Sequence, residues 1–133
     1  MKVVCKTTAA VALVLAIGAS SVASASASPL SNWYLRYATP FGKALVKAGS
    51  EMTKDDPAGC ALLTQAARTA MADPPPPDDT TFTVHWGLAV AFVFAAGTEC
   101  TQGVKNNDSN QVESIVPLMN MADAQVTDMI KSV

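Results

Sequence analysis

Apolar side chains recur every three or four residues in four segments of this chain, and no segment alternates over a useful strand length. The first segment runs from about Ser31 to Lys54, and Pro40 lies inside it. Because the apolar stripe keeps its phase across the proline, we predict one kinked helix rather than a new helix capped by Thr39. The stripe contains Trp33, Tyr37, Phe41, Ala44, Leu45, Ala48 and Met52.

The second segment has clear start and stop signals. Asp56 is a good N-cap, Pro57 suits the first helical position, and we predict that the helix ends at Asp73. Four consecutive prolines, Pro74–Pro77, then form a stiff extended spacer that rises about 3 Å per residue.

The third segment, from about Thr81 to Gln102, is apolar nearly all round. Such a helix is normally buried, so we predict that it lies at the centre of the fold. Its stretch without any polar side chain covers only Gly87 to Gly97, which is too short to span a bilayer.

The fourth segment follows the turn at 106–109 and reaches Val133, with a kink predicted at Pro117. Its polar positions, which we assign to the solvent side, are Glu113, Asn120, Asp123, Asp128 and Lys131.

The aromatic residues occur in only two stretches, one in the first helix and one in the third. Aromatic rings prefer edge and offset contacts with one another, so these two helices should pack together. The fold expected is all-α, a compact antiparallel bundle of about four helices. The rings are Trp33, Tyr34, Tyr37, Phe41, Phe82, Trp86, Phe92 and Phe94.

Residues 1–27 have the pattern of a secretory signal peptide, which leaves 28–133 as a single domain. Lys2 and Lys6 precede a short apolar run, and small residues follow with cleavage motifs that end at Ala25 and Ala27. The alternative is a membrane anchor, but an apolar run of about ten to twelve residues is short of the roughly twenty that span a bilayer. The expected location is secreted or cell envelope, with no transmembrane segment in the mature chain.

Cleavage removes Cys5 and leaves Cys60 and Cys100, which in an exported chain are best interpreted as one disulfide. Two free thiols or a metal pair are the alternatives. In a hairpin of the second and third helices, the cysteines lie about 10 Å out of register at 1.5 Å per residue. We expect the spacer Pro74–Pro77 to absorb that offset.

The charge of the chain argues against nucleic acid as a partner. Its formal net charge is −2, and loss of Lys2 and Lys6 makes the mature chain more acidic, whereas nucleic-acid binding usually needs a basic face.

Residues for catalysis or metal binding are scarce, so we expect neither an enzyme nor a cofactor or metal site. His85 is the single histidine, and no glycine-rich phosphate loop, CxxC pair or calcium loop occurs. The acidic pairs at 55–56 and 78–79 stand at helix starts, where capping explains them. The candidate ligand-binding residues are His85, Trp86, Tyr34 and Tyr37. A haem carrier that uses His85 is an alternative, against a histidine ring that simply lies at a helix edge.

The stretch from Cys60 to Cys100 resembles a group of small exported actinobacterial helical proteins of unknown function. The shared pattern comprises Cys60, the four prolines with Asp78, Trp86, Ala89, Ala95-Ala96 and Cys100. The resemblance covers about the middle third of the chain and implies an exported helical domain. It implies no activity, so no functional residue is carried over.

The function expected from the sequence is that of an exported, non-enzymatic helical protein. It would bind an apolar small molecule between its helices or a cell-envelope partner on its surface. The alternative is a purely structural or interaction protein without a ligand.

Overall fold

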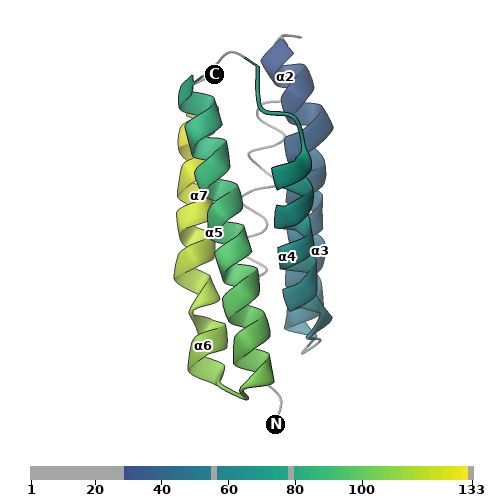
Figure 1. Cartoon of the computed structure of the whole chain (residues 1–133), viewed down its shortest axis with the longest axis vertical. Coiled ribbons are helices and arrows are strands. Elements are labelled where there is room, and N and C mark those ends of the chain that lie inside the picture. Colours follow the sequence, from purple (N-terminus) through teal and green to yellow (C-terminus); the bar gives the residue numbers. More distant parts are fainter. Residues whose placement is uncertain (1–28, 55–56, 78–79, 132–133) are drawn as a thin grey trace.

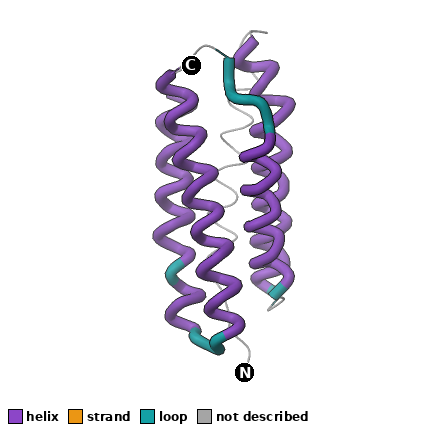
Figure 2. The backbone as a smooth tube through the Cα atoms, viewed as in Figure 1, coloured by secondary structure: helices purple, strands orange, loops and turns teal. Residues whose placement is uncertain are grey.

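The protein is an antiparallel helical bundle, as expected (Figures 1 and 2). The computed structural model describes residues 29–54, 57–77 and 80–131, and within these ranges it contains helices and no strand. Its four main helices are α3 (Thr39–Thr53), α4 (Ala58–Ala72), α5 (Thr80–Lys105) and α7 (Ile115–Lys131). Helix α5 packs against both α4 and α7, and α3 packs against α4.

The chain stays helical from Pro29 to Thr53, so the prediction of one helical run across Pro40 is confirmed. The run begins with α2 (Pro29–Trp33) and continues through a π-helical segment, η1 (Tyr34–Ala38), into α3. The Thr39 N–H donates to the carbonyl of Tyr34, five residues back. This wider turn lies directly before Pro40, whose missing N–H interrupts the ordinary helical bonding.

Helix α4 begins one residue later than predicted, because Pro57 occupies the position before the helix rather than its first turn. Asp56, its expected cap, lies outside the described residues. The helix ends as expected: Asp73 has an extended backbone with ψ 153°. The residue before a proline avoids helical geometry, so the first proline of the spacer terminates α4.

The proline spacer runs beside α2 toward the end of the bundle where α5 begins (Figure 1). The indole Nε1 of Trp33 donates a hydrogen bond of 2.8 Å to the carbonyl of Pro74. The spacer therefore carries the chain past the end of α4 to the level at which α5 starts, as the cysteine register requires.

The last helix is divided rather than kinked. Asp108 accepts a hydrogen bond of 3.1 Å from the Gln111 N–H and caps α6 (Ser109–Glu113). The helix breaks at Ser114, and Pro117 then lies in the first turn of α7. The predicted kink at Pro117 is therefore wrong in position: a proline is tolerated in a first turn, so the interruption falls just before it.

The core joins the first and third predicted helices, as the aromatic clustering indicated. The Trp86 ring on α5 lies edge-on to Trp33, with centroids 5.1 Å apart, and also contacts Phe41 at 5.2 Å. Phe82 packs against Trp33 and Tyr34 at 5.7 and 6.2 Å. These rings are buried and tie α2, η1 and α3 to α5.

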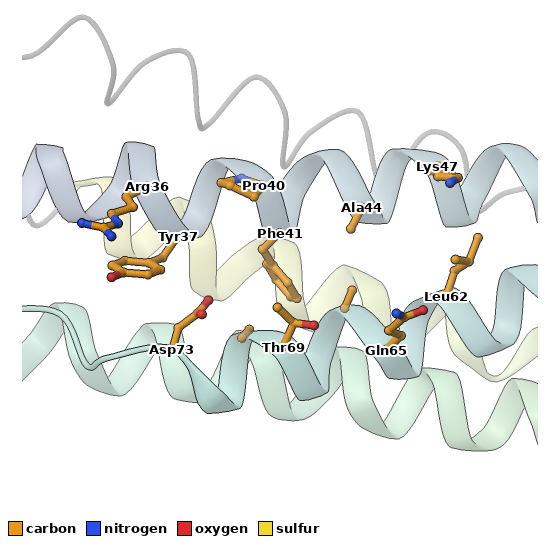
Figure 3. A pocket seen from close by; sticks show the side chains of 12 residues that line it. Arg36, Tyr37, Pro40, Phe41, Ala44, Lys47, Leu62, Gln65, Thr69 and Asp73 are labelled. Atoms are coloured by element: carbon orange, nitrogen blue, oxygen red, sulfur yellow. The ribbon is translucent and has the colours of Figure 1, made fainter.

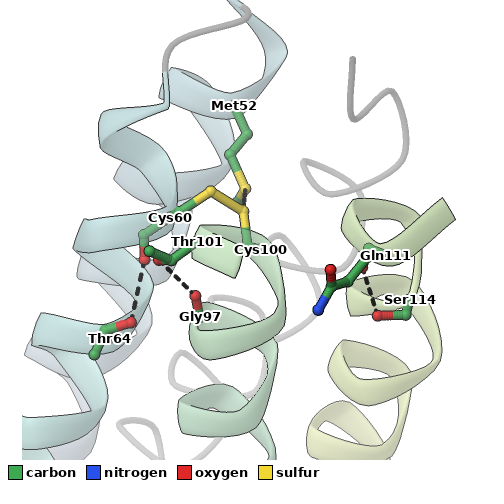
Figure 4. The surroundings of a disulfide bond; sticks show 8 residues. All are labelled: Met52, Cys60, Thr64, Gly97, Cys100, Thr101, Gln111 and Ser114. Atoms are coloured by element: carbon green, nitrogen blue, oxygen red, sulfur yellow. Dashed lines mark hydrogen bonds between the residues drawn. A yellow bond between two sulfur atoms is a disulfide. The ribbon is translucent and has the colours of Figure 1, made fainter. Parts of the chain in front are cut away.

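Cys60 on α4 and Cys100 on α5 form the expected disulfide, with a Cα–Cα distance of 5.4 Å (Figure 4). Both cysteines are buried, and the Met52 sulfur lies 3.8 Å from the Cys100 sulfur. The alternatives of free thiols and a metal pair do not match this geometry.

Near this bridge, α4 and α5 approach so closely that only glycine fits on α5. A Cβ added to Gly97 would lie 2.8 Å from the backbone N of Thr64, whereas one added to Gly87 would meet no atom within 4 Å. We expect Gly97→Ala to lower the free energy of unfolding by about 1–3 kcal/mol through overpacking.

Gly87→Ala is the matched control on the same helix. It should stabilise the protein by about 0.5–1 kcal/mol, because alanine has the higher helix propensity. Urea unfolding of both variants measures the contrast, and equal effects of the two substitutions would contradict the close approach at Gly97.

Candidate functional site

A groove of about 500 Å³ lies between α4 on one side and η1 with α3 on the other (Figure 3). Its floor and walls are mainly apolar, because one flank of each helix turns small or aromatic side chains toward the other. We call it the α3–α4 groove. The apolar lining residues are Pro40, Phe41, Ala44, Leu62, Ala66 and Ala70.

Polar side chains stand at both ends of the α3–α4 groove. Arg36, Tyr37 and Asp73 line one end, and Lys47 and Gln65 line the other (Figure 3). The Arg36 guanidinium carbon lies 5.5 Å from the centroid of the Tyr37 ring, within the range of a cation–π contact. The groove thus combines an apolar body with charged groups at its ends.

Of the four residues proposed from the sequence, Tyr34 and Trp86 belong to the packed core. They border a cavity of only about 10 Å³, which has room for no more than one water molecule. Burial raises the pKa of Tyr34 to about 12, so its phenol keeps its proton at neutral pH. Both rings therefore pack the bundle at this point.

His85 and Tyr37 lie on different sides of the bundle. The His85 Nδ1 lies 2.6 Å from the Gln125 side-chain oxygen, which joins α5 to α7. Tyr37 lines the α3–α4 groove, and His85 does not. The structure therefore does not bring the four candidates together, and Tyr37 alone contributes to this groove.

A second, shallower depression of about 330 Å³ lies beside the proline spacer. Part of the Trp86 side chain lines it, together with Met71 of α4 and Gly87 and Val90 of α5. It adjoins the α3–α4 groove, because Ala70 and Asp73 line both. The depression and the α3–α4 groove are therefore continuous at Ala70 and Asp73.

Most of the residues that line the α3–α4 groove were not predicted from the sequence as site residues. They include Arg36, Lys47, Gln65, Thr69 and Asp73. Arg36 lies on η1, Lys47 on α3, and Gln65 and Thr69 on α4, while Asp73 directly follows α4. The helical side chains among them flank a buried stripe, and that position is the signal present in the sequence. The pairing of the two flanks is a tertiary feature, however, and one helix alone does not reveal it.

Asp123 is not on the solvent side of the last helix, as predicted; it is partly buried on α7. One of its carboxylate oxygens is buried without a hydrogen-bond partner, and desolvation raises the pKa of Asp123 to about 7. Asp123 lies one helical turn after the buried Met119 and three residues before the buried Val126. It is therefore on the flank of α7 that packs into the bundle.

Stability should fall as this carboxyl ionises. Because the pKa of Asp123 is raised in the folded state, its stabilising contribution is complete below about pH 4 and is lost as the pH rises through 7. We expect Asp123→Asn to flatten the decline of unfolding free energy with pH. Urea unfolding at several pH values measures it, and the exposed Asp128→Asn should leave the decline in place. A wild-type decline that persists in Asp123→Asn would contradict this assignment.

Neither a metal site nor a membrane span is established by the described part of the chain. Within residues 29–54, 57–77 and 80–131, no group of three His, Cys, Asp or Glu side chains is arranged to hold a metal ion. In the same ranges α5, with 26 residues, is long and apolar enough to cross a membrane by length and composition. Core helices also meet this test, and α5 is the helix that packs against both α4 and α7.

Comparison with models of protein families, with curated proteins and with solved structures finds no match to this chain. Functional inference therefore depends on the geometry of the chain itself.

Proposed function

We propose that the mature protein is an exported, non-enzymatic helical protein that binds an apolar small molecule in the α3–α4 groove. The observation that carries the proposal is the groove itself: about 500 Å³, with an apolar floor and a few polar groups at its ends. Small-molecule sites typically enclose about 300–1,000 Å³, are mostly apolar, and have a few polar groups that orient the ligand.

Export is supported by the N-terminal pattern, which lies outside the described residues, and by the buried disulfide. Disulfides persist in oxidising compartments and are rare where thiols are kept reduced.

N-terminal sequencing of the protein recovered outside the cytoplasm should begin at Ser26 or Ser28. Small residues precede both positions and match what a signal peptidase requires. Recovery of membrane-bound protein that retains Met1 would contradict export by cleavage.

Isothermal titration calorimetry with 1-dodecanol and with dodecanoate tests binding. We expect saturable binding of at least one of them. Ala44→Trp fills the middle of the groove from α3, and Thr69→Trp fills it from α4, so each should abolish the binding (Figure 3).

Ala91→Trp is the matched control, because Ala91 is exposed on α5 and lines neither groove. It should bind like the wild type. If neither amphiphile binds, or if both groove variants bind like the control, the proposed function is wrong.

An interaction protein without a small-molecule ligand is the second candidate. Exposed apolar side chains at Val84 and Leu88, one turn apart on α5, and at Met121 on α7 favour it. Where exposed apolar side chains form a contiguous patch, they often mark contacts with other proteins. A protein that binds neither amphiphile would favour this candidate.

A further inference from the structure

The two ends of the α3–α4 groove differ in charge. At one end, Arg36 is accompanied by the carboxyl group of Asp73, and its guanidinium lies over the Tyr37 ring (Figure 3). The positive charge there has an acidic neighbour and an aromatic face. An incoming anion at that end would meet the Asp73 carboxylate as well as the guanidinium, so attraction and repulsion partly cancel.

The other end carries a positive charge without an acidic neighbour in the groove. Lys47 on α3 is exposed, and the side-chain amide of Gln65 stands across from it on α4 (Figure 3). Glu51, one turn further along α3, does not line the groove, and its carboxylate pairs with Lys54 at 3.7 Å. The Lys47 ammonium group suits a carboxylate or another small anion, and the Gln65 amide is a further donor at the same end of the groove.

The length of the apolar body between these ends limits the shape of the ligand. Arg36 and Lys47 are eleven positions apart, which corresponds to about 16 Å along a helix at 1.5 Å per residue. An extended chain of about twelve carbons has a similar length, because each C–C bond of about 1.5 Å advances the chain by about 1.3 Å. A single linear chain therefore matches the groove.

From these observations, and resting on the proposed function, we infer that the ligand is a single-chain amphiphile with an anionic head. The head lies at the Lys47–Gln65 end, and the chain runs over the apolar floor toward Tyr37 (Figure 3). The groove is lined by two cationic side chains and one acidic side chain, although the whole chain has a net charge of −2. This local excess of positive charge opposes the overall charge of the protein and selects an anion.

The test is calorimetry with three amphiphiles that share a twelve-carbon chain and differ in the charge of the head group: dodecanoate, 1-dodecanol and dodecyltrimethylammonium. Dodecanoate should bind most tightly and should weaken as salt is added, since salt screens a partly exposed charge pair. Lys47→Ala should weaken dodecanoate binding about threefold to fivefold, in line with a partly exposed ion pair. The same variant should weaken 1-dodecanol binding less than it weakens dodecanoate binding, because the alcohol carries no charge.

Lys43→Ala is the matched control. Lys43 is exposed one turn before Lys47 on α3, and it does not line the groove. Its loss should leave dodecanoate binding as in the wild type, whereas Lys47→Glu should weaken it further than Lys47→Ala.

The outcomes separate this inference from the proposed function. If 1-dodecanol and dodecanoate bind equally well, or if Lys43→Ala and Lys47→Ala have the same effect, the anionic head at Lys47 is wrong while binding in the groove stands. If neither 1-dodecanol nor dodecanoate binds, the proposed function itself is wrong.

Discussion

Trp86→Ala is expected to lower the free energy of unfolding by about 3–5 kcal/mol, the typical cost of truncating a buried tryptophan. The Trp86 side chain is 6% exposed and contacts Trp33 and Phe41 through edge-to-face ring pairs. Its removal would leave a cavity between α5 and the helical run from α2 to α3. Small domains have only about 5–15 kcal/mol of stability, so the loss is a large share of the total.

Urea unfolding followed by far-ultraviolet circular dichroism measures this change. The control is Val84→Ala on the same helix, because Val84 is 53% exposed and its truncation should cost little. Trp86→Phe keeps an aromatic ring and should fall between the two. If Trp86→Ala costs no more than Val84→Ala, the ring cluster does not stabilise the bundle.

Removal of the disulfide is expected to have a comparable effect. The bridge joins residues separated by 40 positions, for which the chain-entropy model gives about 4 kcal/mol of stabilisation. The variant Cys60→Ala with Cys100→Ala removes it without leaving free thiols in a buried site. Urea unfolding should show this loss, and reduced wild-type protein should show a similar one.

Peptide mapping without reduction checks the bridge itself. It should yield one linked fragment that contains Cys60 and Cys100, and neither cysteine of the native protein should react with a maleimide. Two reactive thiols in the native protein would contradict both the bridge and the register set by the proline spacer.

The helices could be predicted because each has an apolar stripe of helical period that is visible without any partner. The same reasoning identified the disulfide, because two cysteines in a chain that is predicted to be exported have few other roles. It also identified the proline spacer, which joins α4 to α5 at the level that the bridge requires. Helix ends were less predictable: α5 continues through Gly103 to Lys105, since its packing against α6 supports residues of weak helical propensity.

Local departures from regular geometry escaped prediction for a physical reason. Pro40 and Pro117 both predict an interruption of helical hydrogen bonding. In the structure the irregular geometry lies in the residues before each proline: a π-helical segment precedes Pro40, and a break at Ser114 precedes Pro117. Several backbone arrangements accommodate a missing N–H, and packing selects among them.

The candidate site was the least predictable part. Aromatic and histidine side chains have distinctive chemistry and were therefore the candidates predicted from the sequence. In the structure Tyr34 and Trp86 pack the core, and His85 lies against Gln125. The α3–α4 groove depends instead on which flanks of two helices face each other. Neither Lys47 on α3 nor Gln65 on α4 is distinctive within its own helix.

Native mass spectrometry of the protein, purified from its own host without denaturant, tests the central claim most directly. We predict a bound small molecule that is released on denaturation, carries an anionic head and is absent from Ala44→Trp, whose new ring fills the α3–α4 groove. The Ala91→Trp control should retain it. The claim that this groove is a ligand site would be contradicted if Ala44→Trp carried an adduct of the same mass and occupancy. It would also be contradicted if the wild-type protein carried no adduct and bound no amphiphile.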